Sequence, residues 1–279
     1  MEHSFKKLGL AITSSPTGIA LLKEAKRLKD IFNAELFLIH VEEKTPEAEK
    51  SLKSIIDNSG LSFQDTQLIW ASGDPANTIL NTSKNAGVDL LVAGALEKEG
   101  FIKYYIGSVA RKIMRESSSS LLILKEPSQN PKPFKKFYVA TDFSFESERT
   151  IRMTYNFALL EKAEEFVIVR DYDTPGLAST ILDSVSIDEL ETVKKQWQNE
   201  EEEKLRMFIK ELNLKGLEIK TCCLYGKEGW ETSNFVRQNK GDIFALTAPR
   251  KRLKLIDRIF HHQLEYSFEK LPSNLLLIR

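Results

Sequence analysis

The stretch that decides the fold is Val88–Leu124, VDLLVAGALEKEGFIKYYIGSVARKIMRESSSSLLIL. It begins and ends with nearly unbroken apolar runs, which are typical of strands whose two faces are both covered. Between the two runs lies a helical pattern, Val109–Met114, directly after Gly107 and Ser108. A strand, a helix and a second strand joined in this way predict a parallel, doubly wound sheet.

The same organisation occurs twice along the chain. Lys7–Ser15, KLGLAITSS, aligns with Lys136–Ser144, KFYVATDFS, at an offset of 129 residues. The next strands, Glu35–Val41 and Glu165–Arg170, keep this offset. Similarity at a constant spacing indicates a duplicated structural unit.

The offset rises to 153 further along, where Val88–Gly94 matches Gly241–Thr247. The increase of 24 predicts an insertion in the second copy around residues 171–210, including a polar helix over about 189–210. We therefore predict an α/β fold with two tandem doubly wound domains, each with a five-stranded parallel sheet.

A proline-rich linker separates the two copies. Residues 126–133 read EPSQNPKP, and three prolines in eight residues exclude a helix and favour an extended spacer. The predicted division is domain 1 at 1–128, the linker at 129–134 and domain 2 at 135–279.

Each copy ends in a strand that needs a partner. An exposed edge strand is an aggregation hazard, so we expect Leu121–Leu124 of the first copy to lie alongside Leu275–Ile278 of the second. This pairing would make the chain an internal pseudo-dimer. A homodimer of the whole chain is left open.

Composition narrows the class of protein. The 279 residues are 42% hydrophobic and 29% charged, which excludes a disordered chain, a collagen and a disulfide scaffold. Forty basic residues balance forty acidic ones, so no cationic excess favours nucleic-acid binding. No apolar run approaches the roughly 18–20 residues that cross a bilayer, and the first residues lack a signal-peptide core. We expect a cytoplasmic protein that binds neither nucleic acid nor membrane.

The first copy contains a candidate phosphate site. Gly107 and Ser108 open a helix directly after the loop that follows Gly94. Glycine lets an anion approach the backbone, serine is a good N-cap, and the first amides of a helix attract phosphate. The alternative interpretation is an ordinary helix cap.

This spacing resembles the signature of the universal stress protein family, G-x2-G-x9-G-(S/T). The resemblance extends to His40-Val41, Gly73-Asp74-Pro75-Ala76 and the terminal strand at Leu121, and it covers both copies. It implies an adenine nucleotide α-hydrolase-like fold, pairing of domains through their last strands, and ATP binding in some members.

For ATP in domain 1, the resemblance implies a particular set of contacts. Adenine would lie near Thr13 and Val41, and the phosphates would lie on Gly94, Gly107, Ser108 and Val109.

Domain 1 departs from the pattern of ATP-binding members at two positions. Thr13 stands where those members end the first strand with an aspartate, and Glu97 replaces the second glycine. A carboxylate within about 4 Å of a phosphate would cost about 4 kcal/mol at an effective dielectric of about 20. The first site is therefore expected to be degenerate.

Domain 2 departs at other positions. It keeps the strand-end aspartate as Asp142, which we interpret as a remnant, but Thr247 replaces the first glycine. Phe260, His261 and His262 fall where Gly-Ser belongs, and a phenylalanine there would fill the space of a phosphate. We expect no nucleotide in domain 2.

We find neither a catalytic constellation nor a metal-ligand set in the sequence. The leading hypothesis is a non-enzymatic stress-response protein that acts through a protein partner or a small ligand. The alternative is an ATP-binding switch, with slow hydrolysis, that uses domain 1 alone. An enzyme of a related nucleotide-binding class, handling flavin or adenylate transfer, is disfavoured because the additional cofactor-binding sequence is missing.

Overall fold

The computed structural model describes residues 4–12, 17–62, 66–97, 104–105, 107–173, 187–226, 229–248 and 271–279. Its first half contains β1 (Lys7–Ile12), α1 (Gly18–Phe32), β2 (Glu35–Val41), α2 (Pro46–Asn58), β3 (Gln67–Ala71), α3 (Pro75–Ala86), β4 (Leu90–Gly94), β5 (Leu96–Glu97), β6 (Tyr104–Tyr105), α4 (Ser108–Glu116) and β7 (Ser120–Leu124). Its second half contains β8 (Lys136–Ala140), α5 (Phe145–Leu160), β9 (Glu165–Tyr172), α7 (Ile187–Leu212), β10 (Lys220–Tyr225), α8 (Trp230–Gln238), β11 (Ile243–Thr247) and β12 (Asn274–Ile278).

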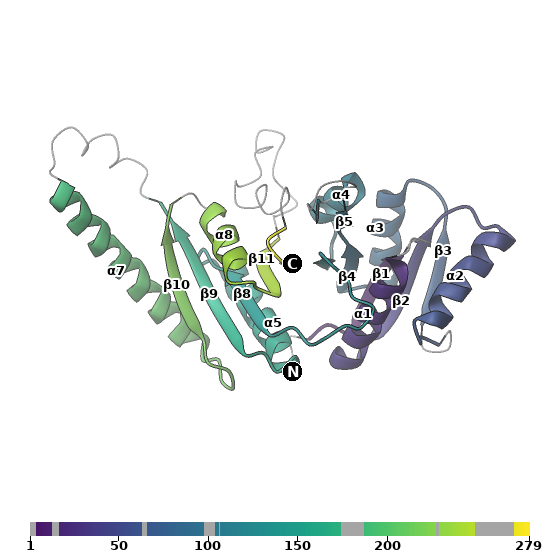
Figure 1. The fold of residues 1–279 in the computed structure, drawn as a ribbon, viewed down its shortest axis with the longest axis horizontal. Helices are drawn as coiled ribbons and strands as arrows, with labels where there is room; N and C mark the ends of the chain where they lie inside the picture. The colour runs from purple at the N-terminus through teal and green to yellow at the C-terminus, as the bar shows by residue number, and fades with distance from the viewer. Residues whose placement is uncertain are drawn as a thin grey trace.

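Ten of these strands form one continuous sheet, in the order β10-β9-β8-β11-β12-β7-β4-β1-β2-β3. Every neighbouring pair within each half is parallel, so each half has the predicted five-stranded parallel sheet. The two halves lie side by side, with α7 flanking β10 at one end and α2 flanking β3 at the other (Figure 1).

The halves join through β7 and β12, which are antiparallel. Leu122 lies opposite Leu276 in this pair, and both side chains are fully buried. This confirms the predicted pairing of the last strands. Each edge strand covers the other, which leaves neither exposed to solvent along that side.

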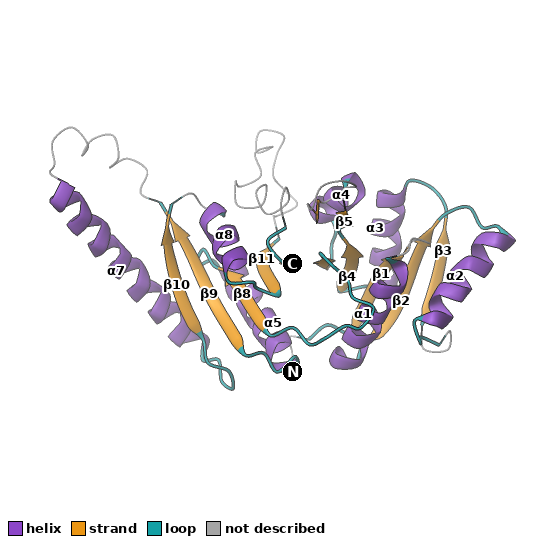
Figure 2. Ribbon diagram, in the orientation of Figure 1, coloured by secondary structure: helices purple, strands orange, loops and turns teal. Residues whose placement is uncertain are grey.

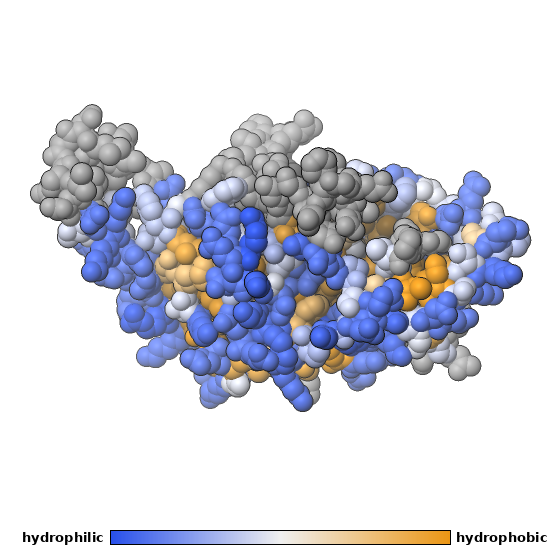
Figure 3. Space-filling view, viewed as in Figure 1, coloured by the Kyte–Doolittle hydropathy of each residue, from blue (hydrophilic) through white to orange (hydrophobic). Residues whose placement is uncertain are grey.

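Helices cover both faces of the sheet (Figure 2). One hydrophobic core gathers buried side chains of α1, α2, α5 and α7, and the other gathers those of α3, α4 and α8. Burial on both faces explains why the strands are almost continuously apolar instead of alternating. Within the described ranges, every helix is too short or too polar to span a bilayer. The face drawn in Figure 3 is mainly hydrophilic, with apolar atoms visible between the elements.

The two halves repeat details as well as elements. Asp89 accepts hydrogen bonds from the two consecutive amides that lead into and open β1, at 2.7 and 3.1 Å. Asp242, its equivalent at the offset of 153, accepts from the two amides that lead into and open β8, at 2.6 and 2.9 Å. These matching contacts support the duplication inferred from the sequence.

Crossed hydrogen bonds at the domain junction follow the same pseudo-twofold symmetry. The amide of Lys125 donates to Asn274 Oδ1 at 2.9 Å, and the amide of Arg279 donates to Ser120 Oγ at 3.2 Å. Each donor and each acceptor is related to its counterpart by the offset of 154 residues. The two last strands are thus tied by equivalent contacts at both ends.

Two features differ from the sequence prediction or extend it. The stretch after Gly94, predicted as a loop, contains a short antiparallel ladder in which Leu96 pairs with Tyr105 and Glu97 pairs with Tyr104. The insertion of domain 2 includes α7, which has 26 residues where its counterpart α2 has 13. The helix expected over 189–210 is therefore present. The domain bounds 1–128 and 135–279 stay a prediction; between them, residues 125–135 contain neither helix nor strand.

Candidate functional site

The candidate site of domain 1 lies where its parallel strands end. The strand order places the ends of β4, β1 and β2 side by side, at Gly94, Ile12 and Val41. Ligands bind at this edge in doubly wound sheets. Thr13, predicted to lie near adenine, falls outside the described residues.

His40 links the ends of β1 and β2. Its Nδ1 lies 3.0 Å from the carbonyl oxygen of Ile12, and its Nε2 lies 2.9 Å from Glu42 Oε2. The ring also packs edge-on against Trp70, with centroids 4.6 Å apart. The Ile12 carbonyl oxygen can only accept, so the contact with Nδ1 is a hydrogen bond that the imidazole donates. His40 thus holds the strand ends together.

The helix that follows β4 presents its amino end as predicted, with one correction. Gly107 is the N-cap and Ser108 is the first helical residue, so the serine does not cap α4. The cap has no side-chain hydrogen bond, the first turn contains no acidic residue, and Ser108 and Val109 are exposed. The first amides of α4 therefore meet no capping side chain within the described residues, and such amides attract anions.

A neighbouring ion pair holds α4 against α3. Asp74 caps α3 by accepting the amide hydrogen of Asn77 at 3.0 Å. Lys112 of α4 lies 3.7 Å from the same carboxylate oxygen. The pair links the two helices at the surface and adds a cation one turn into α4.

Gly94 has a packing role that the sequence did not reveal. A Cβ at this position would lie 3.1 Å from Leu21 Cδ1 on α1, which is a tight contact that the leucine side chain would have to relieve. In domain 2 the equivalent residues are Thr150 and Thr247, whose hydroxyl oxygens lie 2.9 Å apart. The close packing of Leu21 on Gly94 thus gives this glycine a structural role.

Glu97 lies in β5, where it pairs with Tyr104. Its predicted conflict with a bound phosphate stays a prediction, as do the proposed roles of Val41, Gly94, Gly107, Ser108 and Val109. Gly94 and Val41 end the strands on either side of β1, and Gly107, Ser108 and Val109 lie at the start of α4.

In domain 2, Asp142 serves a local turn. It accepts hydrogen bonds from the amide and the hydroxyl of Ser144, at 3.0 and 2.5 Å. Burial raises the pKa of Asp142, but hydrogen bonds from Ser144 and Ser147 outweigh this effect, and the pKa lies below its ordinary value. Ser144 in turn caps α5 by accepting the amide of Ser147 at 3.1 Å. The carboxylate is engaged in starting this helix.

Arg170 occupies the position in domain 2 that Val41 has in domain 1. Its guanidinium lies 5.1 Å from the ring centroid of Phe143, which packs in turn against Phe208 of α7. Its Nε lies 3.6 Å from Glu201, also on α7. The sequence analysis missed this cluster, although the offset of 129 already matched Arg170 with Val41. Helix α7 supplies both of these partners, Glu201 for Arg170 and Phe208 for Phe143.

Asp171 is a second strand-end residue that sequence reasoning missed. It is buried, and it accepts hydrogen bonds from the amides of Gly229 and Thr232, at 2.6 and 3.2 Å, and from the Thr232 hydroxyl. Burial raises the pKa of Asp171 above its ordinary value, although these donors oppose the shift. Its carboxylate holds the start of α8.

Phe260, His261 and His262, predicted to block the second phosphate site, lie outside the described residues. Among the residues that are described, no group of three or more histidine, cysteine, aspartate or glutamate side chains is arranged to hold a metal ion.

The fold and its strand-end sites define a tandem, doubly wound α/β protein. Residues 42–125 match the model of the universal stress protein family. The chain is 24% identical over 150 residues to universal stress protein MJ0531 of Methanocaldococcus jannaschii, covering 46% of this chain and 86% of that protein. It is 27% identical over 147 residues to universal stress protein YxiE of Bacillus subtilis, covering 43% and 99%. These matches confirm the resemblance to the universal stress protein family that was seen in the sequence.

Two solved structures share the fold over the whole chain. A putative universal stress protein from Pseudomonas aeruginosa superimposes with a TM-score of 0.73 at 17% identity, covering 99% of this chain and 94% of that one. A universal stress protein from Archaeoglobus fulgidus superimposes with a TM-score of 0.65 at 14% identity, covering 98% of each chain. The tandem arrangement therefore occurs in other proteins.

Proposed function

We propose that this universal stress protein works by binding, not by catalysis, and that its nucleotide site is degenerate. In this proposal it acts in the cytoplasm, through a protein partner or a small ligand at the strand ends. The observation that carries the proposal is that the titratable side chains at these ends serve the fold. His40 bridges two strands, Asp142 accepts a hydrogen bond from Ser144, the residue that caps α5, and Asp171 holds the start of α8.

The chemistry of domain 2 supports the same proposal. Arg170 stacks on Phe143 at the position where the family resemblance would place adenine, and Thr247 bonds to Thr150 where the first glycine would stand. In domain 2, side chains thus stand both at the position expected for adenine and at the position of the first glycine. We infer that domain 2 mainly stabilises the tandem and presents α7 as a surface for other molecules.

The open amino end of α4 favours one alternative, an ATP-binding switch with slow hydrolysis that uses domain 1 alone. Its uncapped amides could receive phosphate, and Lys112 lies one turn away. This alternative makes a prediction that the leading proposal does not. Mg-ATP would stabilise the protein measurably.

A thermal-shift titration with Mg-ATP separates the two. A ligand at 100 times its Kd adds about 2.7 kcal/mol to the free energy of unfolding, so even weak binding is visible. The informative variant is Val109→Glu, which places a carboxylate in the first turn of α4. It repels phosphate but stabilises the helix by roughly 0.3–1 kcal/mol through the dipole, so lost binding would not reflect unfolding.

Val109→Gln, which has nearly the same size but no charge, is the matched control. The degenerate-site proposal expects no shift with wild type at about 5 mM ATP, a concentration at which a 1 mM Kd is already detectable. A shift that Val109→Glu abolishes and Val109→Gln keeps would establish the ATP-binding alternative instead. Glu97→Gly, which restores the family's glycine, is expected to strengthen any nucleotide binding. Mass spectrometry of molecules that co-purify with the native protein tests for other ligands.

A further inference from the structure

The two sides of the pseudo-twofold junction have different chemistry. On one side, Arg27 of α1 crosses to domain 2 and bonds Glu161 at 2.7 Å, while it also bonds Glu24 of its own helix at 2.5 Å. Its guanidinium lies 4.8 Å from the ring centroid of Phe134. The positive charge of Arg27 is therefore paired with two carboxylates. We call the side of the junction that contains Arg27, Glu24, Glu161 and Phe134 the closed side.

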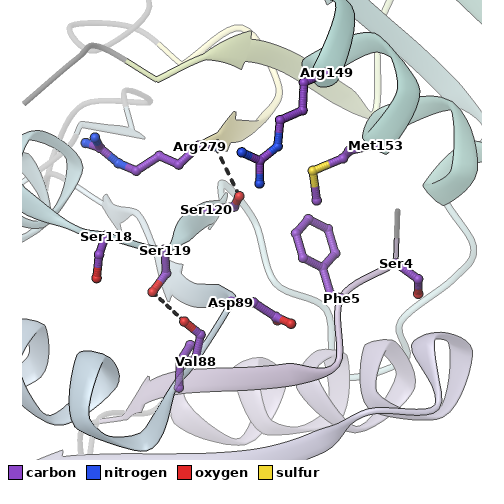
Figure 4. Close-up of a pocket in the computed structure, with 10 residues that line it drawn as sticks. All are labelled: Ser4, Phe5, Val88, Asp89, Ser118, Ser119, Ser120, Arg149, Met153 and Arg279. Atoms are coloured by element: carbon purple, nitrogen blue, oxygen red, sulfur yellow. Dashed lines mark hydrogen bonds between the residues drawn. The ribbon is translucent and has the colours of Figure 1, made fainter. Parts of the chain in front are cut away.

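The other side of the junction is open. Phe5, the equivalent of Phe134 at the offset of 129, lines a groove of about 300 Å³ between the domains. We call this the Arg149 groove; its lining includes Ser4, Phe5, Asp89, Ser118, Arg149 and Arg279. It lies where β4 and β7 begin, whereas the candidate site of domain 1 lies where the strands end. In Figure 4, Arg149 reaches from α5 toward Ser120, above the ring of Phe5.

The groove presents the guanidinium group of Arg149. Arg149 is exposed, and within the described residues neither a carboxylate nor a hydrogen-bond acceptor contacts it. The Arg279 guanidinium is already engaged, because it donates to the carbonyl oxygens of Met114 and Arg115. Asp89 is the one carboxylate side chain in the described lining, and two backbone amides already bond to it.

Comparison with the closed side shows what the groove lacks. The residue equivalent to Glu24 at the offset of 129 is Met153, which also lines the groove. The carboxylate of Glu24 thus corresponds to a thioether in the groove, while Arg27 itself corresponds to Asn156, so Arg149 is a cation that the closed side does not have. The hydroxyl of Ser118 adds a donor that has no hydrogen-bond partner among the described residues.

We propose that the Arg149 groove binds a small oxyanion, a phosphate or carboxylate group of a metabolite, which would pair with the Arg149 guanidinium. The planar guanidinium of Arg149 matches the geometry of such groups and can donate two parallel hydrogen bonds. The lining comes from both domains, so a bound anion would link them. This site is separate from the strand-end site of domain 1.

Isothermal titration of the full chain tests the proposal, with inorganic phosphate and succinate as probes and ionic strength held constant with chloride. Saturable binding with a Kd of millimolar order or tighter is expected for at least one probe. Arg149→Gln removes the charged fork at an exposed position and is expected to weaken binding by about tenfold or more. Arg149→Lys keeps the charge without the fork and should lie between.

Lys53→Gln on α2 is the matched control, because it removes one exposed positive charge far along the chain from the groove. Its affinity for the anion should equal that of wild type. Binding that is absent in wild type up to about 10 mM, a range that covers weak metabolite sites, would overturn the proposal. So would an equal loss of affinity in Lys53→Gln, since the effect would then reflect net charge. Circular dichroism confirms that each variant is folded.

Discussion

Replacing Arg27 by methionine tests how the two domains are held together. Arg27 is the cation shared by Glu24 and Glu161, which are 4% and 2% exposed. Its loss would leave two carboxylates buried beside each other without a counter-charge. Glu161 is already short of partners, because its Oε1 has no hydrogen bond within the described residues.

The expected cost follows from this burial. Breaking a buried ion pair by removing one partner costs about 3–5 kcal/mol, because the remaining charge stays desolvated. Replacing all three members by apolar residues of similar volume, as in Arg27→Met/Glu24→Leu/Glu161→Met, is expected to recover most of that loss. The control Arg206→Met removes an arginine from an exposed pair on α7 and should change stability by about 0.5 kcal/mol or less.

The loss of stability in Arg27→Met is expected to depend on pH through the Glu24 carboxyl group. Burial raises the pKa of Glu24, while Arg27 opposes the shift, so loss of Arg27 should raise this pKa further. An acid whose pKa is higher in the folded state makes its favourable contribution to stability below its unfolded pKa, and this contribution is lost as the pH rises through its folded pKa. The deficit of Arg27→Met is therefore expected to be largest near pH 8 and to shrink toward pH 5.

Urea denaturation followed by circular dichroism at both pH values measures this deficit. A loss below about 1 kcal/mol at pH 8 would show that the cluster is not the buried charge pair described here, since even one unsatisfied buried group costs that much. A loss of equal size at the two pH values would contradict the role assigned to the carboxylates.

Other changes test packing, capping and thiol chemistry. Gly94→Thr should cost about 1–3 kcal/mol by overpacking against Leu21. The double variant Gly94→Thr/Leu21→Thr copies the threonine pair of domain 2. In urea denaturation it should lose less stability than the sum of the two single variants, by about 0.5 kcal/mol or more. Strictly additive losses would refute the equivalence of the two pairs. Asp171→Ala should destabilise the protein by about 1–3 kcal/mol because two buried amides lose their acceptor, and Asp171→Asn should recover part of this; unchanged melting of the alanine variant would refute it. Burial, with help from nearby carboxylates of α7, raises the pKa of Cys223 to about 12. Its alkylation by iodoacetamide at pH 8 should be slower than that of free cysteine by on the order of a thousandfold, and a rate equal to that of the urea-unfolded chain would contradict this.

Much of the fold could be predicted because its signals are local and repeated. Apolar runs such as Leu121–Leu124 identify buried parallel strands, and constant offsets identify the duplication. Pairing of β7 with β12 followed from the need to cover an edge strand. The short β5–β6 ladder was missed because two-residue strands have no detectable periodicity.

Less of the candidate site could be predicted. The amino end of α4 followed from Gly107 and its place after a strand, although the cap itself proved to be the glycine. The cluster of Arg170 with Phe143 and Phe208 could not be seen, because its members come from three separated elements. Similarly, Gly94 was predicted to contact a ligand phosphate, whereas in the structure the Leu21 side chain packs against it.

Sequence patterns alone are enough to predict the repeated α/β units, the parallel strands within each and the resemblance to the universal stress protein family. These properties depend on hydrophobic patterns and spacings that any local stretch of the chain carries. Only the tertiary structure decided that Arg27 meets Glu161 across the junction while Arg149 faces an open groove. The physical reason is that duplicated sequences give equivalent elements, but the balance of charge between them depends on which single side chains meet after the two domains have packed.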